Sequence, residues 1–413
     1  MHYILSPFGS AGDVFPMLGL ALALKDRGHP ITFLANGYFR EAVERYGLDY
    51  VELGTKEQFL ESLADPNLWH PTNAFGHIVS NYVAPMMRPQ YDEFVKRYEK
   101  GKSVGIINVF GFGGLIAQDK IGMPMITLHM QPSVIWSDYA PPELPGMFGP
   151  YWLQSILVWI AERFWIDAVA CPPINALRAE LGLPAMSRTM HYWHSSYGVA
   201  CLFPEWFAPP QIDWPKNLLQ TDFPLWDEKQ EVQMPAEAEA YLAAGEPPIV
   251  FTPGSANVQG KDFFAAAASA CEKLQRRGIL LTKFPEQIPA KLPPGVVHFS
   301  FVPLTLLLPR CAAFVNHGGV GSMSQAFAAG IPQVIMPMAH DQFDNASRVK
   351  RLGVGDSLEM SRFTGDNLAA CLKPLLESPQ VTSTCRTIAE RLRPRDGLAR
   401  MAEAIERRTE QGG

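Results

Sequence analysis

Residues 312–322 read AAFVNHGGVGS, and this run decides how the chain around it folds. Its first four residues are apolar and predict a buried parallel strand. Three glycines follow directly, and a helical pattern then begins at Ser322 and ends at Gly330, where Pro332 adds a further stop signal. A strand, a glycine turn and a helix start leave backbone N–H groups unpaired beside the positive end of the helix dipole, which favours a bound phosphate. His317 and Ser322 can add side-chain donors, although a tight turn that serves only packing has the same pattern.

Two flanking motifs make the phosphate interpretation more specific. Residues 301–303 read FVP before the turn, and residues 337–346 read PMAHDQFDNA after it. In order and spacing, the three segments resemble the donor signature of the family-one glycosyltransferases, which is an aromatic-x-Pro, a His-x-Gly-x-x-Ser turn and Pro-x-x-x-Asp-Gln-x-x-Asn-Ala. That family has the GT-B fold, in which two Rossmann-like domains with parallel sheets face each other. The resemblance therefore implies a site for a nucleotide sugar.

The same resemblance implies a role for each matched residue. Phe301 would stack on the base, and Val302 would present backbone groups to the edge of the base. Asp341 and Gln342 would bond the sugar hydroxyls. The diphosphate would lie against the turn and its residues His317, Gly319, Val320, Gly321 and Ser322.

Two further positions concern the nucleotide of the donor and its phosphates. The family has a Glu three residues after the Ser of the turn, where it accepts hydrogen bonds from the ribose hydroxyls; this protein has Gln325. A deoxyribose has one hydroxyl fewer, so we expect a dTDP-sugar beside a UDP-sugar, while a solvated helix residue is the other interpretation of Gln325. Ser255, after the strand at 249–251 and Gly254, matches the family's second phosphate contact, and an ordinary turn explains it as well.

Strand and helix signals alternate in both halves of the chain, which predicts an α/β protein with two doubly wound parallel sheets. We predict an acceptor-binding domain at 1–225 with a linker to about 245, and a donor-binding domain at 246–380. As in the family it resembles, the last segment, 381–413, is expected to cross back to the first domain.

Composition narrows the class of protein. The 413 residues carry a net charge of −6, which gives no electrostatic reason to expect nucleic acid as a partner. Six scattered cysteines predict reduced thiols, and no signal peptide or membrane span is expected. The histidines lack metal-ligand spacing and no Asp-x-Asp motif occurs, so we expect neither a metal nor a cofactor. The prediction is a cytoplasmic protein, with contact at the inner face of the membrane left open, as is its oligomeric state.

Asp13 is the predicted catalytic base. The family places a His in a G-H-x-x-P turn after the first strand, and residues 12–16 of this protein read GDVFP. A carboxylate base occurs in the branches that resemble sterol, antibiotic and rhamnolipid glycosyltransferases. The alternative role of Asp13 is a helix N-cap, and the helix dipole is expected to lower its basicity. Asn108 follows a later strand, where His-based members carry an Asp that orients the base.

The acceptor site is expected among aromatic side chains in the first half. Candidate contacts are Ser10, His129, Trp136 and Phe148. Residues 129–165 are rich in Trp, Tyr and Phe, which favours an apolar acceptor, although much of this stretch is expected to be helix core. A membrane-facing use of the helix from Trp152 to Trp165 is a further possibility.

Within the wider family, the sequence as a whole resembles the rhamnolipid rhamnosyltransferases most closely, on residues 9–16, 201–210 and 339–345. The predicted function is an inverting glycosyltransferase that moves a hexose or deoxyhexose to a hydroxyl of a lipophilic small molecule such as a hydroxy fatty acid, sterol or polyphenol. Two alternatives stay open: a sugar-nucleotide epimerase of the same fold, and a non-catalytic partner subunit that binds nucleotide sugar or lipid.

Overall fold

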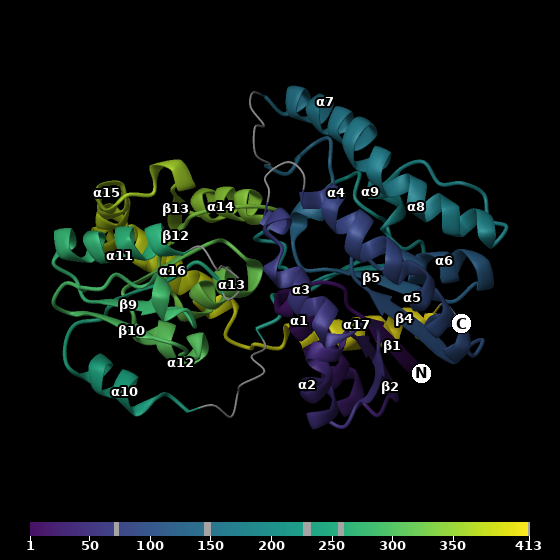
Figure 1. Ribbon diagram of the computed structural model, residues 1–413, viewed down its shortest axis with the longest axis horizontal. Helices are drawn as coiled ribbons and strands as arrows, with labels where there is room; N and C mark the ends of the chain where they lie inside the picture. The colour runs from purple at the N-terminus through teal and green to yellow at the C-terminus, as the bar shows by residue number, and fades with distance from the viewer. Residues whose placement is uncertain (70–73, 144–149, 226–232, 255–259, 412–413) are drawn as a thin grey trace. The chain divides into compact units, whose positions relative to one another are not determined.

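The computed structural model describes residues 1–69, 74–143, 150–225, 233–254 and 260–411 (Figure 1). The protein forms two compact units. Unit 1 comprises Met1–Trp226 and Asp396–Gly413, and unit 2 comprises Asp227–Arg395. Residues 381–395 therefore lie with the second unit, and the return to the first unit starts at Asp396.

Unit 1 is built on a parallel sheet whose strand order is β3-β2-β1-β4-β5-β6-β7. The strands β2, β4 and β5 are buried at every position, as expected for a parallel sheet covered on both faces. Successive side chains alternate between the faces, so Tyr3 and Leu5 enter one core while Ile4 enters the other. The strands are β1 His2–Ser6, β2 Ile31–Ala35, β3 Asp49–Glu52, β4 Ser103–Ile107, β5 Met125–His129, β6 Gly198–Cys201 and β7 Leu218–Gln220.

Helices cover both faces of this sheet. α1 and α17 contribute to the core that contains Tyr3, whereas α5, α6 and α8 contribute to the core that contains Ile4. The α-helices of unit 1 are α1 Ala11–Asp26, α2 Arg40–Arg45, α3 Lys56–Ala64, α4 Ala74–Ile78, α5 Ala84–Arg97, α6 Phe112–Ile121, α7 Tyr151–Ala161, α8 Asp167–Glu180, α9 Thr189–Tyr192 and α17 Gly397–Gln411. Shorter 3-10 turns are η1 Gly37–Phe39, η2 Pro66–Trp69 and η4 Pro132–Val134, and π-helical turns are η3 Val79–Val83 and η5 Glu162–Ile166.

Unit 2 repeats this plan with a parallel sheet of order β10-β9-β8-β11-β12-β13. Its strands are β8 Ile249–Thr252, β9 Gly278–Leu281, β10 Val296–Phe299, β11 Ala313–Asn316, β12 Gln333–Ile335 and β13 Gly355–Ser357. Its helices are α10 Ala236–Ala243, α11 Lys261–Leu274, α12 Leu304–Leu307, α13 Val320–Ala329, α14 Gln342–Arg351, α15 Gly365–Glu377 and α16 Pro379–Arg391, with short turns η6 Pro285–Gln287, η7 Leu308–Arg310 and η8 Met360–Arg362. The predicted fold class, α/β with two parallel doubly wound sheets, is confirmed.

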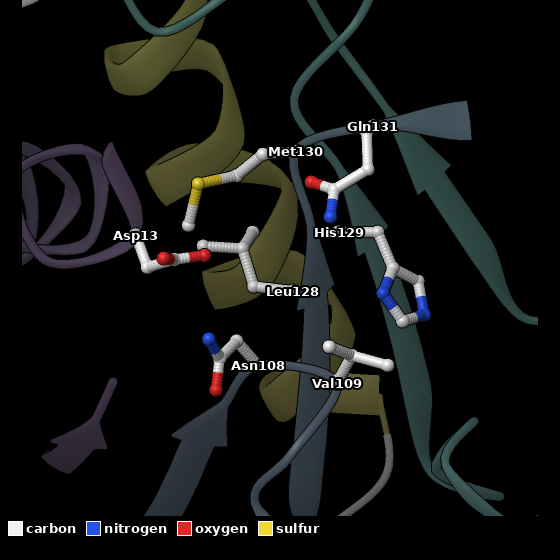
Figure 2. Close-up of a pocket in the computed structure, with 7 residues that line it drawn as sticks. All are labelled: Asp13, Asn108, Val109, Leu128, His129, Met130 and Gln131. Carbon is white, nitrogen blue, oxygen red and sulfur yellow. The ribbon is translucent and has the colours of Figure 1, made fainter. Parts of the chain in front are cut away.

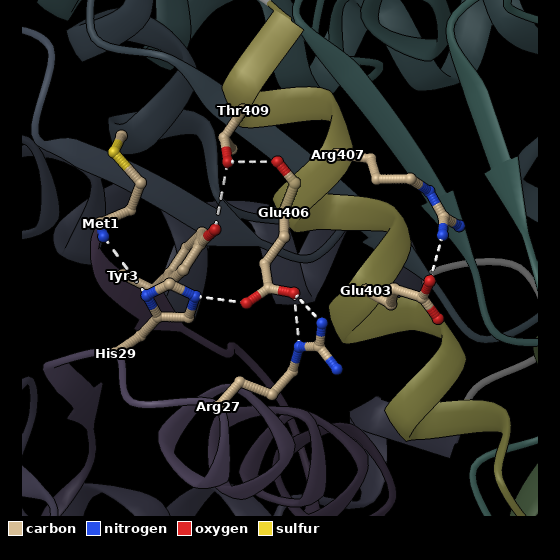
Figure 3. Close-up of polar contacts among 8 residues, drawn as sticks. All are labelled: Met1, Tyr3, Arg27, His29, Glu403, Glu406, Arg407 and Thr409. Carbon is tan, nitrogen blue, oxygen red and sulfur yellow. Dashed lines mark hydrogen bonds and ion pairs between the residues drawn. The ribbon is translucent and has the colours of Figure 1, made fainter.

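The C-terminal helix α17 is held in unit 1 by polar contacts as well as by its apolar side (Figure 3). The Glu406 carboxylate lies 2.5 Å from Nε2 of His29 and also pairs with Arg27. The Tyr3 hydroxyl lies 3.2 Å from Oγ1 of Thr409. These contacts join β1 and the segment between α1 and β2, both early in the sequence, to the C-terminal helix α17.

The strand order of each sheet reverses between two particular strands. In unit 1 the reversal lies between β1 and β4, and in unit 2 between β8 and β11. In open α/β sheets, ligands bind beyond the carboxyl ends of the strands at such a point. Asn108, Gly254 and His317 lie in the loops after β4, β8 and β11, and Asp13 lies in the first turn of α1, just after the β1 loop. The topology therefore brings the candidate residues together in pairs within each unit.

Candidate active site

The turn between β1 and α1 is closed by its own side chains. Ser10 is the N-cap of α1, and its Oγ accepts a hydrogen bond from the Gly12 N–H at 3.2 Å. The Ser10 N–H donates to Oδ2 of Asp13 at 2.9 Å, which completes a capping box. Gly9 has a φ of +129°, and a Cβ there would lie 2.3 Å from Oδ2 of Asp13, so the turn needs glycine at this position. The proposed N-cap role of Asp13 is wrong, because Ser10 is the cap and Asp13 is its partner in the first turn.

The Asp13 carboxylate has one oxygen engaged and one available. Both hydrogen bonds from Ser10 reach Oδ2, and Oδ1 accepts none from the described residues. Burial raises the pKa of Asp13 to about 6, against the opposing effect of the Ser10 hydrogen bonds. We expected the helix dipole to make this carboxylate less basic; that expectation is wrong, because the cost of burying the charge is larger. The result is a carboxylate whose pKa is close to neutral pH, as a general base requires.

Asp13, from the first turn of α1, lines a pocket together with residues at the carboxyl ends of β4 and β5 (Figure 2). Asn108, at the end of β4, fixes one wall of it: its Oδ1 accepts from the Phe8 N–H at 3.1 Å, and its Nδ2 donates to the Phe8 carbonyl at 2.5 Å. Both groups of the amide are used to hold the loop that leads to Asp13. The complete lining is Asp13, Asn108, Val109, Leu128, His129, Met130 and Gln131.

His129 is buried in this wall, where its neighbour is a second histidine. Its Nε2 lies 2.9 Å from Nδ1 of His194, and its Nδ1 has no partner among the described residues. Burial lowers the pKa of His129 well below its ordinary value, and it lowers the pKa of His194 to about 3. Both rings are therefore neutral at physiological pH.

The other predicted acceptor residues lie in different surroundings. The Ser10 hydroxyl is used in the capping box, Trp136 is half-buried against the core that contains Ile4, and Phe148 lies outside the described residues. The aromatic stretch was expected to be largely helix core, and this is wrong. In α7, Val158 is buried, whereas the exposed fraction is 66% for Trp152 and 56% for Trp159. Phe164 in η5 is 71% exposed.

In unit 2, the turn between β11 and α13 differs from the β1–α1 turn in its capping. Its N-cap is Gly319, and no side chain of the described residues caps the helix. The first N–H groups of α13 are therefore available to an anion. The turn is held from behind, because the Gly318 N–H donates to Oδ1 of Asn316 at 2.8 Å and Nδ2 of Asn345 donates to the Gly318 carbonyl at 2.8 Å.

The His317 ring lies over Gly254, where a Cβ would come within 2.8 Å of the ring. Gly254 follows β8 and has a φ of +97°. Burial lowers the pKa of His317 to about 4, so the ring is neutral, and its Nδ1 has no partner among the described residues. A neutral imidazole and open backbone N–H groups at one helix start are suited to binding a diphosphate.

The residues predicted to contact the sugar lie just before and at the start of α14. Oε1 of Gln342 accepts from the N–H groups of Met338 and Ala339, at 2.7 and 3.1 Å. Its amide NH₂ is then the group left to face a ligand. Oδ2 of Asp341 accepts from Nδ2 of Asn345 at 2.7 Å, which connects Asp341 to the same Asn that holds the phosphate turn. His340 has a φ of +56°, a strained conformation of the kind that concentrates at functional sites.

The remaining predicted donor residues differ in their exposure. Phe301 is 36% exposed, as a stacking ring must be, and Val302 is buried with only its backbone left to meet a base. Gly321 is exposed, and Val320, Ser322 and Gln325 are half-buried along the first part of α13. Ser255 lies outside the described residues. Their roles stay predictions.

Comparison with known proteins relates the segments that contain these two turns to glycosyltransferases and antibiotic biosynthesis proteins. The model of the glycosyltransferase family 28 N-terminal domain matches residues 3–99, and the model of the erythromycin biosynthesis protein CIII-like C-terminal domain matches residues 279–402. Across 98% of its length, the chain is 27% identical to the O-mycaminosyltylonolide 6-deoxyallosyltransferase of Streptomyces fradiae, of which it covers 97%. The structure of the glycosyltransferase VinC in complex with dTDP matches with a TM-score of 0.70 at 21% identity, over 100% of both proteins.

The chain is a glycosyltransferase of the GT-B fold. A sterol 3-beta-glucosyltransferase of Arabidopsis thaliana is also similar, at 24% identity over 98% of this protein and 65% of that one. The two matched models include the Asp13 turn and the His317 turn respectively, so each turn lies in a segment that a family model matches.

Two further observations on the described residues concern metal sites and helices that could span a membrane. Among the described residues, no group of three or more His, Cys, Asp and Glu side chains is placed to hold a metal ion, and metal independence stays a prediction. None of the described helices has both the length and the apolar character needed to cross a membrane.

Sequence reasoning named Asn108 and Asn345 but did not foresee the loops that they hold, and it did not foresee the contact of His194 with His129. The available signal was weak: a polar residue directly after a buried strand marks the edge of a parallel sheet where ligands bind. Asn108 carries that signal, whereas nothing near His194 in the sequence indicates that it meets His129.

Proposed function

We propose that this glycosyltransferase moves a hexose or deoxyhexose from a dTDP- or UDP-sugar to a hydroxyl of a lipophilic small molecule, with inversion at the anomeric carbon. The observation that carries the proposal is the Asp13 carboxylate, which lines a pocket, has an uncommitted Oδ1 and has a pKa raised to about 6. Asp13 takes the proton of the acceptor hydroxyl as that oxygen attacks the anomeric carbon. The bond from this carbon to the diphosphate breaks in the same step.

The departing diphosphate is assigned to the second turn. His317 and the first N–H groups of α13 provide neutral donors where negative charge develops, which is the arrangement that stabilises a leaving anion. In this proposal these donors act without a metal ion or a cofactor. Ser322 adds a hydroxyl, Phe301 and Val302 hold the base, and Asp341 and the NH₂ of Gln342 bind the sugar.

The relatives support the choice of substrates. The 6-deoxyallosyltransferase carries a deoxyhexose in its name, the VinC structure holds dTDP, and the Arabidopsis relative acts on a sterol. Gln325, in place of the Glu expected from the family, favours a deoxyribose donor and therefore a dTDP-sugar. A dTDP-L-rhamnose donor with a hydroxy fatty acid acceptor is the form of the proposal that the likeness to rhamnolipid rhamnosyltransferases favours.

The exposed aromatic face of α7 and η5 supports an apolar acceptor. Trp152, Ile156 and Trp159 share one side of α7, and all three are largely exposed. Aromatic residues of this kind suit a boundary between water and an apolar phase. The proposal therefore includes peripheral contact with a membrane. Loss of vesicle binding in a Trp152→Ala, Trp159→Ala double variant would support this part, and unchanged binding would remove it.

A donor panel followed by a transfer assay tests the proposed function. Thermal shifts with dTDP, UDP, dTDP-L-rhamnose and UDP-glucose identify the donor, because a ligand that binds the folded state raises its melting temperature. The matched donor is then incubated with hydroxy fatty acids, sterols and polyphenols, and the products are analysed by mass spectrometry and NMR. A glycosylated acceptor of inverted configuration supports the proposal. Isomerised donor without an acceptor indicates the epimerase, and binding without any turnover indicates the partner subunit.

A further inference from the structure

Three side chains of unit 1 form a short series of hydrogen bonds that leads to the Asp13 pocket. The Trp193 Nε1–H points to Nε2 of His194 at 3.3 Å, and also to the Val134 carbonyl at 3.2 Å. Nδ1 of His194 then lies 2.9 Å from Nε2 of His129. His129 is 2% exposed and lines the pocket that contains Asp13.

This arrangement favours one placement of the ring protons. An indole N–H can only donate, so Nε2 of His194 is an acceptor and carries no proton. Since the ring is neutral, its single proton lies on Nδ1 and is donated to Nε2 of His129. Nε2 of His129 is then the acceptor of that bond, so the one proton of His129 lies on Nδ1. The opposite assignment would place a proton on Nε2 of His194 facing the indole N–H, which sets two donors against each other.

The outcome is a buried N–H donor with nothing to bond among the described residues. Nδ1 of His129 exposes less than 1 Å² and has no partner among them. In Figure 2 this nitrogen lies on the side of the ring that faces Val109 and the pocket, while the other nitrogen lies on the far side. A buried donor without an acceptor is costly to the folded protein, and native structures retain one chiefly where a ligand or a water completes it.

We propose that the Nδ1–H of His129 binds an oxygen atom of the acceptor molecule, next to the hydroxyl that Asp13 deprotonates. This inference rests on the proposed function and narrows its substrate class. The acceptor carries a second oxygen close to the hydroxyl that receives the sugar: a carbonyl, ester, ether or further hydroxyl. Because the donor is a neutral imidazole, this oxygen need not be charged. A 3-hydroxy ester meets the requirement, and a simple secondary alcohol of the same length does not.

The tautomer is tested first, in the wild-type protein with ¹⁵N-labelled histidine. We expect His129 and His194 both to carry their proton on Nδ1, visible in the ¹⁵N shifts and couplings of the two rings, assigned with His129→Gln and His194→Gln. Titration with methyl 3-hydroxydecanoate should move the Nδ1 signal of His129, and 3-decanol should not. A proton on Nε2 of His129 overturns the inference. A Nδ1 signal that neither probe moves also overturns it, and indicates a bonded water instead.

Two substitutions separate acceptor binding from mere support of the fold. The amide of Asn resembles the Nδ1 side of a histidine, whereas the longer Gln reaches the position of Nε2. His129→Asn therefore keeps a donor toward the pocket and loses the contact with His194, and His129→Gln does the reverse. We expect the wild type to prefer methyl 3-hydroxydecanoate to 3-decanol in kcat/KM by roughly 3- to 10-fold, the usual effect of one neutral hydrogen bond. His129→Gln should lose this preference and His129→Asn should keep it.

The controls make each outcome decisive. His191→Gln changes an exposed histidine outside the pocket and should retain the wild-type preference. If the Asn and Gln variants lose the preference equally, His129 has only a structural role and the inference fails. If the wild type glycosylates neither probe, the proposed acceptor class fails, while the Nδ1 titration still reports whether the ester binds His129.

Discussion

The β1–α1 turn and the β11–α13 turn have the same architecture and opposite chemistry. Each follows a buried strand beside the reversal of its sheet, and each contains glycine before a helix start. In the first, Ser10 and Asp13 satisfy the helix N-terminus with a capping box. In the second, Gly319 leaves that N-terminus uncapped among the described residues. In the proposed function, the first turn thus provides a carboxylate for proton transfer, and the second provides donors for an anion.

The difference arises from a few side chains and not from the backbone plan. A side chain that caps a helix competes with an external anion for the same N–H groups. Ser10 provides such a cap, whereas glycine at 319 provides none. The substitutions below test this division of roles, starting with the largest expected effect.

Asp13→Asn should lower sugar transfer by roughly 10²–10⁴-fold, the usual contribution of a positioned base. The amide keeps an oxygen that can accept from the Ser10 N–H, so the capping box should be retained, and below about pH 4 the melting temperature should change little. Donor affinity should be retained, because the donor is assigned to unit 2. Turnover, dTDP binding and melting temperature are to be measured on the same preparation. Transfer at the wild-type rate would end the catalytic assignment of Asp13.

His317→Ala should cost about 2–4 kcal/mol of transition-state stabilisation, or roughly 30- to 1000-fold in kcat/KM, as for other lost donors to a developing anion. The loss should appear with every acceptor, since the diphosphate is common to all of them. Steady-state kinetics with the donor varied provide the measurement. If KM for the donor and kcat both stay unchanged, the diphosphate does not lie against His317.

Gly254→Ala and Gly28→Ala form a matched pair. Both glycines have a positive φ, +97° and +90°, so alanine strains each backbone by about 1–2 kcal/mol. A Cβ at Gly254 would also meet the His317 ring at 2.8 Å, whereas one at Gly28 meets nothing within 4 Å. Gly254→Ala should therefore weaken donor binding on the order of 10-fold by displacing His317, and Gly28→Ala should lower only the melting temperature. Equal donor affinity in the two variants would contradict the placement of the ring.

Gln325→Glu should shift the preference from dTDP toward UDP by a few-fold, because a carboxylate accepts hydrogen bonds from ribose hydroxyls more strongly than an amide does. In the wild type, dTDP should bind at least as well as UDP. Calorimetry with the two nucleotides on both proteins measures the shift. A wild type that binds UDP more than a hundredfold tighter than dTDP would show that the deoxyribose argument is wrong.

The smallest effect concerns stability against pH. The pKa of Asp13 is raised from 3.8 to about 6 in the folded protein, so the folded state binds this proton more tightly than the unfolded state does. Its contribution to stability is therefore present in full below pH 3.8 and is lost as the pH rises through about 6. The Asp13→Asn variant has no titrating group at this position, so it lacks this pH-dependent contribution to stability. Its melting temperature relative to wild type should rise between about pH 4 and 6 by a few degrees, then level off. A constant difference across this range would contradict the raised pKa.

Much of the fold could be predicted from the sequence, because local patterns encode it, whereas the donor site stays a prediction. Short apolar runs specify strands that are buried on both faces, and glycines with a following helical pattern specify the two turns. The spacing of residues 301–346 singled out Phe301 and Val302; the ring of Phe301 is 36% exposed and Val302 is buried, and their roles stay predictions. The capping box of Ser10 and Asp13 was also visible in principle, as a Ser followed three residues later by an acid.

The sequence by itself determined the two α/β units and the glycine turns, and it was enough to predict which groups would meet a sugar nucleotide. Only the tertiary structure decided which residues support them: Asn108 holds Phe8, 100 residues earlier, and His194 holds His129 across 65 residues. It also decided that Trp152 and Trp159 face outward and that burial makes Asp13 more basic. The physical reason is that strand order and burial depend on contacts between distant segments, whereas strands, caps and turns depend on neighbours in the sequence.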